Sequence, residues 1–423
     1  MSSEFEEPTF EEIKAPTKSA FSMGPFGSRI KAENFVSEGV PVIKGGNLNG
    51  DLDSSSFDFL TPEKAAELST SIARSLDLVI THRGTLGQVG IIPPNSRYPE
   101  YIVSQSQLKL SFDQTKVNSY FVYYFLRSSV GQRRLLANTS QVGVPAIAQA
   151  LTSIRNIRIP LPSLKEQDGI VGALRLLDDR IALLRETNAT LEAIAQAIFK
   201  SWFVDFDPVH ANAKGRAPEG MSEATAALFP DNFEESELGL VPRGWKVERL
   251  ETFMELSYGK ALKATERIVG GVPVYGSGGI TGCHNESLVN GPSIVIGRKG
   301  TVGSLYWEDQ PFFPIDTVFY VRSVMPMTYC FYLLQTLGLA DMNTDAAVPG
   351  LNRNNVYRLK VPKAPEAVLS AFNDVVDVLR GSIFKNNQQA QTLATLRDTL
   401  LPRLISGQLR LPEAETALEA VTE

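Results

Sequence analysis

Residues 170–202, IVGALRLLDDRIALLRETNATLEAIAQAIFKSW, carry the strongest structural pattern of this chain. Its seam positions alternate at intervals of four and three residues, which is the heptad pattern of a helix with one buried edge. At 1.5 Å per residue the helix would be about 50 Å long. The seam comprises Ile170, Leu174, Leu177, Ile181, Leu184, Asn188, Leu191, Ala195, Ile198 and Trp202. An apolar seam of this length needs a partner.

A second seam of the same spacing lies 202 residues further along the chain. It carries two interruptions, the polar Asn386 and the charged Arg397. The two helices are copies of one element, and we predict that they pack against each other as an antiparallel coiled coil. The residues predicted to form this interface are Leu177, Ile181, Leu184, Leu191, Ile198, Trp202, Leu379, Ile383, Leu393 and Leu400.

The segments before the two helices are also repeated. GVPVIKGGNLNG (39–50) returns as GVPVYGSGGITG (271–282), and LVITHRGTLGQVGII (78–92) returns as IVIGRKGTVGSLYW (294–307). NTSQVGVPAIAQALTSIRNIRIPLP (138–162) returns in shorter form at 343–365. The blocks keep their order, and loop deletions account for offsets that shrink along the chain. We interpret this pattern as a tandem duplication.

The duplication predicts an α+β protein with two mixed α/β globular domains, separated by the two long helices and related by approximate two-fold symmetry. The predicted domains are a globular domain at 1–162, a long helix at about 164–203 within a helix-and-link segment at 163–242, a second globular domain at 243–363, a second helix at 364–410 and an acidic tail at 411–423.

Composition narrows the class of protein. The 423 residues are 43% apolar and 21% charged, which is typical of a globular chain. No run of about 20 apolar residues and no signal-peptide pattern occurs, so we expect a cytoplasmic location. Cys283 and Cys330 are the only cysteines, and they are expected to be packing residues rather than a disulfide or part of a metal site.

The charge is divided unevenly along the chain. Residues 1–162 carry 16 basic and 15 acidic side chains, and residues 243–363 carry 13 and 10. The segments 163–242 and 364–423 carry 7 against 14 and 5 against 8, so the helical parts hold the acidity. Locally basic globular halves suit a protein that binds nucleic acid, although an excess this small is also common in ordinary domains.

Two matching turns are the best candidates for contacts with DNA. His82-Arg83-Gly84-Thr85 and Arg298-Lys299-Gly300-Thr301 each follow an apolar run of strand type. Arginine reads guanine, asparagine and glutamine read adenine, and cations bind phosphate. The alternative is that these residues only form turns and helix caps. The candidates are Lys44, Asn47, Arg83, Thr85, Gln105, Gln107, Gln141, Ser277, Arg298, Lys299, Thr301, Asn352, Arg353 and Asn354.

Motifs for catalysis are absent from the sequence. There is no G-x-x-x-x-G-K-[ST] loop for ATP and no N-P-P-[YF] or D-P-P-[YF] motif of an amino-methyltransferase. The three histidines form no metal-binding pair. We therefore expect no catalytic residue, metal or cofactor in this chain.

The chain resembles the specificity subunit of type I restriction-modification enzymes along nearly its whole length. The resemblance rests on the link, with SWFVDFDPV (201–209), LFP (228–230) and LGLVPRGW (238–245), and on IPLPSLKEQ (159–167), RGTLG (83–87) and RLISG (403–407). It implies two target recognition domains for double-stranded DNA and helices that act as a molecular ruler. It also implies two docked modification (methyltransferase) subunits that use S-adenosylmethionine, and restriction subunits that use ATP and Mg²⁺.

The resemblance also has departures. The second copy of the LPSLKEQ motif reads Val361-Pro362-Lys363-Ala364-Pro365-Glu366-Ala367 and lacks the Gln.

Two domains held about one helical turn of DNA apart, ~34 Å, would read a two-part asymmetric target with a fixed spacer. The alternatives are a protein scaffold or degenerate subunit that shows no sequence preference on DNA, and a fused methyltransferase.

Overall fold

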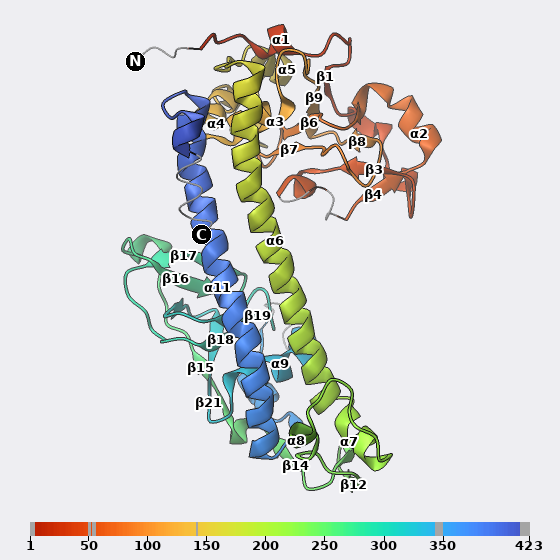
Figure 1. Cartoon of the computed structure of the whole chain (residues 1–423), viewed down its shortest axis with the longest axis vertical. Coiled ribbons are helices and arrows are strands. Elements are labelled where there is room, and N and C mark those ends of the chain that lie inside the picture. Colours follow the sequence, from red (N-terminus) through yellow and green to blue (C-terminus); the bar gives the residue numbers. More distant parts are fainter. Residues whose placement is uncertain (1–4, 50–51, 53–55, 141–142, 343–349, 415–423) are drawn as a thin grey trace. The chain divides into compact units, whose positions relative to one another are not determined.

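The computed structural model describes residues 5–49, 52, 56–140, 143–342 and 350–414. The chain folds into two compact units (Figure 1). The first contains the described parts of residues 1–183 and 389–423, and the second contains those of residues 184–388. Each unit therefore holds one globular domain together with one half of each long helix. Among the described residues, no helix is both long and apolar enough to cross a membrane.

An antiparallel sheet forms the centre of the first unit. Its central strand β6 (Leu78–Thr81) is buried at every position, as expected for a continuous apolar run covered on both faces. Helices α3 (Ser119–Arg127) and α4 (Ser129–Leu135) follow, and α3 packs beside the sheet at its edge strand β7 (Val89–Ile91). The strand order is β1 (Phe21–Met23), β9 (Gln107–Leu110), β6 and β7 (Val89–Ile91).

A second, mixed sheet completes the first unit, with β3 (Val40–Ile43) parallel to β8 (Tyr101–Val103) at its centre. Its order is β2 (Phe35–Val36), β4 (Asp58–Leu60), β3 (Val40–Ile43), β8 (Tyr101–Val103) and β5 (Ile72–Ala73). The smaller elements are α1 (Phe10–Ile13), η3 (Gly45–Asn49), α2 (Pro62–Glu67), β10 (Thr139–Ser140), β11 (Ala146–Ile147) and α5 (Ala150–Arg155).

The second unit repeats this plan. Its antiparallel sheet has the order β15 (Met254–Tyr258), β21 (Val318–Ser323), β18 (Ser293–Gly297) and β19 (Leu305–Glu308). Its mixed sheet has the order β17 (Gly279–His284), β16 (Val272–Gly276) and β20 (Phe313–Pro314), with β16 parallel to β20. Helices α9 (Met327–Thr336) and α10 (Arg353–Tyr357) follow in the places of α3 and α5. The equivalent strand orders agree with a tandem duplication.

Both globular domains are closed by pairing the start of the domain with its end. In the second unit β14 (Lys246–Arg249) pairs antiparallel with β22 (Lys360–Lys363). In the first unit the bridges Glu6 to Leu161 and Thr9 to Arg158 are equivalent to this pairing. Arg158 and Leu161 lie 202 residues before Lys360 and Lys363 of β22. The link adds α7 (Asp207–Ala213), α8 (Glu223–Ala226), β12 (Phe233–Ser236) and β13 (Gly239–Pro242).

The long helices are α6 (Leu164–Phe203) and α11 (Glu366–Ile405), each of 40 residues. Within the first unit Asp178 of α6 pairs with Arg397 of α11, and within the second Glu192 pairs with Arg380. Within the second unit Asn188 of α6 also contacts Asn387 of α11, so ascending positions on α6 meet descending positions on α11 and the two helices run antiparallel there. Of the predicted interface residues, Leu191, Ile198 and Leu379 are half-buried, and the others are buried: Leu177, Ile181, Leu184, Trp202, Ile383, Leu393 and Leu400.

The cysteine prediction is half right. Cys330 is buried on α9 within the core of the second unit, whereas Cys283 on β17 is exposed. The packing role predicted for Cys283 is therefore wrong, because its strand presents four consecutive exposed residues, 280–283. Of the predicted tail at 411–423, residues 415–423 lie outside the described residues.

Candidate nucleic-acid interface

The basic turn of the first unit is Arg83-Gly84-Thr85, which joins β6 to β7. The Arg83 and Thr85 side chains are exposed, whereas the preceding His82 is buried and its ring contacts the Gln105 carbonyl at 3.2 Å. The backbone is fixed on both sides, because His82 N donates to Ser106 O at 2.9 Å and Ile147 N donates to His82 O at 2.9 Å. A rigid turn therefore presents Arg83 to solvent.

The second unit builds the same turn from Arg298-Lys299-Gly300-Thr301, between β18 and β19. Arg298 N donates to Thr317 O at 2.9 Å, and Leu351 N donates to Arg298 O at 2.8 Å, so Arg298 takes the place of His82. Lys299 and Thr301 are exposed, as are their counterparts Arg83 and Thr85. The duplication thus preserved both the anchoring of the turn and its exposed cation.

Glycines allow both turns to adopt this shape. Gly84 and Gly300 have φ angles of 95° and 84°, and Gly87 and Gly303 have φ angles of 86° and 72°. Residues with a Cβ rarely adopt this left-handed region. A side chain at Gly303 would also collide with the backbone of Leu339, 2.4 Å away. The repeated G-T-x-G spacing is therefore a conformational requirement.

Under the turn of the first unit lies a chain of side-chain amides and hydroxyls. Gln107 donates to Thr81 Oγ1 at 3.2 Å, Thr81 donates to Gln88 Oε1 at 2.9 Å, and Gln88 donates to Gly45 O at 3.0 Å. Gln107 is 1% exposed and also accepts from Ser104. Gln107 was predicted to contact DNA. This does not fit its position, because its buried amide forms hydrogen bonds with Thr81 and Ser104 inside the domain.

Other predicted residues of the first unit lie around the same loops. Gln105 is exposed, and Lys44 is exposed but paired with the Asp58 carboxylate. Asn47 accepts from Lys44 N and donates to Ser56 O, so its amide shapes the turn. A groove of about 300 Å³ separates the 44–45 turn from the 104–107 loop. Gln141 lies outside the described residues.

In the second unit, Ser277 links two predicted loops. Its hydroxyl accepts from Thr301 N at 3.4 Å, and its carbonyl accepts from the hydroxyls of Ser304 at 2.6 Å and Tyr306 at 3.3 Å. The turn between β16 and β17 is thereby held against the basic turn. The structure thus places the candidate Ser277 next to the candidate Thr301 of the basic turn.

The segment Asn352-Arg353-Asn354 adds a third piece to this surface. Asn352 caps α10, since its Oδ1 accepts from Asn354 N at 2.9 Å. The Arg353 guanidinium lies 5.0 Å from the centre of the Tyr258 ring, and that of Arg298 lies 5.3 Å from it. Tyr258 was not among the predicted residues. Its signal in the sequence is an aromatic residue at the outer end of a strand, but only the tertiary structure brings both arginines to it.

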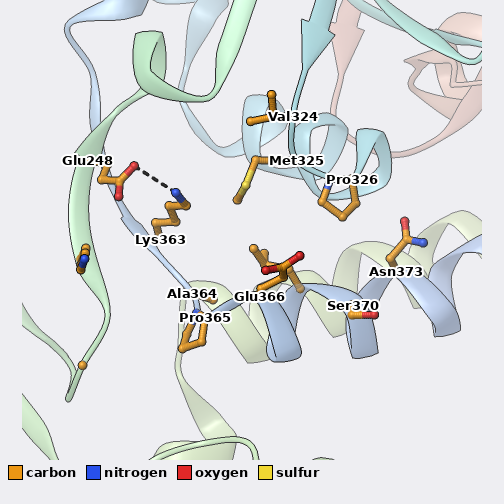
Figure 2. A pocket seen from close by; sticks show the side chains of 13 residues that line it. Glu248, Val324, Met325, Pro326, Lys363, Ala364, Pro365, Glu366, Ser370 and Asn373 are labelled. Atoms are coloured by element: carbon orange, nitrogen blue, oxygen red, sulfur yellow. Dashed lines mark hydrogen bonds and ion pairs between the residues drawn. The ribbon is translucent and has the colours of Figure 1, made fainter.

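A larger cavity of about 750 Å³ lies elsewhere in the second unit, beside β14, β22 and the start of α11 (Figure 2). Figure 2 shows Val324, Met325 and Pro326 facing the first turn of the helix, and Lys363 paired with Glu248 at 3.2 Å. None of the predicted DNA-contacting residues lines it. This cavity is therefore separate from the candidate interface.

Comparison with known proteins decides the family. Residues 26–193 and 242–363, well over half of the chain, match the family described as type I restriction modification DNA specificity domain. This chain belongs to that family. It is a specificity subunit, and the matched segments contain both basic turns and every described candidate residue. The family match thus covers both units.

Relatives of this specificity subunit extend over most of its length. The MjaIX specificity subunit of Methanocaldococcus jannaschii is 23% identical over 84% of this chain and 82% of its own length. The HindI specificity subunit of Haemophilus influenzae is 25% identical over 75% of this chain and 85% of its own. The crystal structure of the S subunit from M. genitalium shares the fold, with a TM-score of 0.56 at 18% identity and 96% coverage of both chains.

Proposed function

We propose that each unit of this specificity subunit reads one half of a two-part DNA sequence, with a fixed nonspecific spacer between the halves. One observation carries the proposal. Arg83 and Lys299 stand at the same place on two sheets of identical strand order, each on a turn anchored by the same backbone hydrogen bonds. A fixed exposed cation at a glycine turn can approach a phosphate or a guanine edge.

The two halves of the target are proposed to differ in sequence. The first unit offers Lys44, Asn47 and Gln105 beside its turn, whereas the second offers Ser277 and the Asn352-Arg353-Asn354 segment. These side chains differ in charge and in hydrogen-bonding groups, although the strands that carry them are equivalent. Different donor and acceptor sets select different base pairs in the major groove.

The chemistry of the assembly is proposed to come from other chains. Two modification subunits would bring S-adenosylmethionine, and restriction subunits would bring ATP and Mg²⁺, in the cytoplasm where the DNA is. The long helices offer exposed apolar side chains for docking: Leu176 and Leu183 in the first unit are 57% and 50% exposed, and Val378 in the second is 69% exposed. Such side chains favour a protein partner.

The decisive experiment is single-molecule sequencing of methylated adenine in genomic DNA. Cells would carry this chain together with a candidate modification subunit, and control cells would carry the modification subunit alone. We expect a methylated two-part motif that disappears without this chain. If an isolated complex of the two proteins produced no such motif, the proposal would fail in favour of a scaffold or a degenerate subunit.

Substitutions at the two matching positions would show which unit reads which half of the DNA target. Arg83→Ala should relax the motif in one half only, and Lys299→Ala in the other half only, each at a cost of ~1–3 kcal/mol for a base contact. A phosphate contact would instead weaken all sequences alike and reduce the salt slope by about one. Lys64→Ala is the control, because Lys64 lies on α2, is already paired with Glu67 and is not among the candidate residues, so it should leave the motif unchanged.

A further inference from the structure

Tyr258 lies at the centre of a cationic cluster in the second unit, in which both arginines are half-buried. It is the last residue of β15 and is 52% exposed. Its ring also packs on the buried ring of Phe319, with the two ring centres 4.9 Å apart. The guanidinium carbons of Arg298 and Arg353 lie 5.3 Å and 5.0 Å from the centre of the Tyr258 ring. Cations at this distance are attracted by the ring quadrupole.

Hydrogen bonds hold both guanidinium groups in place. Arg298 donates from Nε and Nη2 to Asp316 O, at 3.1 Å and 2.5 Å. Arg353 donates from Nη1 to Leu256 O at 3.4 Å and also lies over the Tyr357 ring at 5.5 Å. Because a carbonyl and a ring fix each group, little side-chain entropy remains to be lost when a ligand binds.

The ion pairs among the described residues do not neutralise the charge of the cluster. Within the part of the chain that the structure describes, no carboxylate forms an ion pair with Arg298, Lys299 or Arg353. Nε of Arg353 is buried without a hydrogen-bond partner there. Two arginines gathered on one ring without a counter-charge repel each other, and an anion relieves that repulsion. DNA supplies both phosphate oxygens and the acceptor pair of guanine.

The cluster is peculiar to the second unit. Tyr258 pairs with Phe319 in its sheet, and the residue in the equivalent place of the first unit is Met23, which pairs with Leu108. His82 replaces Arg298 there, and the residues that lead into α5, Gln149-Ala150-Leu151, carry no charge. The cluster therefore does not belong to the scaffold that the duplication preserved. It belongs to the part in which the two recognition domains differ.

We propose that Arg298 and Arg353 contact the second half of the DNA target and determine its sequence, with Tyr258 as the residue that positions them. The inference rests on the proposed function and specifies it further, because it assigns one half-site to one side-chain cluster. Tyr258 itself acts through the two arginines.

The test uses the full chain, assembled with its modification subunits, and a pool of random-sequence 30-base-pair duplexes. Bound DNA is selected and sequenced. The wild-type assembly should return a two-part motif. Tyr258→Ala should leave one half intact and make the other degenerate, with affinity for the wild-type motif reduced about tenfold. Tyr258→Phe keeps the ring and should restore both halves, which a merely structural loss would not explain.

Arg353→Ala removes a side-chain tip without touching the Tyr258 ring, so it tests the cluster even if Tyr258→Ala unfolds the domain. It should relax the same half as Tyr258→Ala. The matched control is Arg322→Ala, since Arg322 stacks on Tyr320 at 5.3 Å on a neighbouring part of β21 outside the cluster. Arg322→Ala should leave the motif unchanged.

The results separate the two proposals. Unchanged specificity in Arg353→Ala, or equal weakening of both halves, would overturn the assignment of this cluster while leaving the two-part target intact. Absence of any two-part motif with the wild-type assembly would instead overturn the proposed function itself.

Discussion

Arg397 Nη1 donates a hydrogen bond to Asp178 Oδ1 at 2.6 Å, and this pair accounts for the charge that interrupts the second apolar seam. Asp178 Oδ2 also accepts from the Tyr124 hydroxyl at 2.7 Å, so one carboxylate joins α3, α6 and α11. In the second unit Glu192 Oε2 accepts from Arg380 at 2.9 Å and from the Tyr332 hydroxyl at 3.2 Å. Each globular domain is thus fixed to the two long helices by a tyrosine, a carboxylate and an arginine.

Breaking the pair should destabilise the first unit. Asp178→Ala removes the partner of Arg397 Nη1 and the acceptor of the Tyr124 hydroxyl, while Arg397 keeps its ion pair with Asp398, and we expect a loss of about 1–3 kcal/mol. Tyr124→Phe removes one hydrogen bond and should cost about 1 kcal/mol. Replacing both charged residues by leucine, together with Tyr124→Phe so that no hydroxyl is left without its acceptor, should be close to neutral, because well-packed apolar residues can substitute for a half-buried ion pair. Urea unfolding of the full chain measures all three, and a combined variant as unstable as Asp178→Ala would contradict this explanation.

The missing glutamine of the second LPSLKEQ copy is compensated. In the first unit Gln167 is fully buried, and its Oε1 accepts from Asn118 N at the cap of α3, at 2.8 Å. In the second unit the same places hold Leu369 and Pro326, and proline has no N–H to satisfy. Gln167→Leu should therefore cost about 1–3 kcal/mol, because it strands the Asn118 N–H. Leu369→Gln should be equally harmful, since its amide would find no such donor, and a neutral result in thermal unfolding would contradict this account.

Asn188 forms a polar layer in the seam. Its Nδ2 donates to Asn387 Oδ1 at 2.8 Å, and its Oδ1 accepts from Asn386 Nδ2 at 2.9 Å. Polar residues at seam positions fix helix register at a cost in stability. We expect Asn188→Leu combined with Asn386→Leu to raise stability while allowing more than one register. Cysteine cross-linking between the two helices would detect this, and a single cross-linking pattern identical to the wild type would refute it.

The length of the helix pair should set the spacer of the DNA target. Inserting one heptad at the middle of both α6 and α11 adds about 10 Å, which corresponds to about three base pairs of DNA. The methylated motif should keep both halves and gain a spacer longer by about that amount. A heptad inserted into α6 alone is the control and should disrupt the pairing of the seams. An unchanged spacer in the double insertion would show that the helices do not act as a ruler.

Acid should loosen the turn of the first unit. Burial lowers the pKa of His82 in the folded state, although the Gln105 carbonyl favours the protonated form. The unfolded chain therefore binds a proton more readily than the folded one, and the stability contributed by neutral His82 is lost as pH falls below about 6.5. His82→Asn should flatten this dependence in melting temperatures between pH 7.5 and 5.5. The second unit has Arg298 at this place and provides the internal comparison.

The sequence alone determined the duplication, the two long helices and the apolar residues of their seams. These features are repetitive and local, because heptad spacing and collinear blocks follow from the chemistry of neighbouring residues. The family resemblance, too, rested on contiguous motifs. The exposed turn residues Arg83 and Lys299 could be found because each follows an apolar run and precedes a glycine that the turn requires.

Which polar side chains face solvent and which form hydrogen bonds inside a domain depends on tertiary contacts. Gln107 and Gln105 are two residues apart, yet Gln107 is buried in a hydrogen-bond chain and Gln105 is exposed. The two arginines that lie over the Tyr258 ring are 40 and 95 residues away from it in the sequence. Arg397 finds its carboxylate 219 residues away. Such partners depend on long-range packing, which no local pattern records.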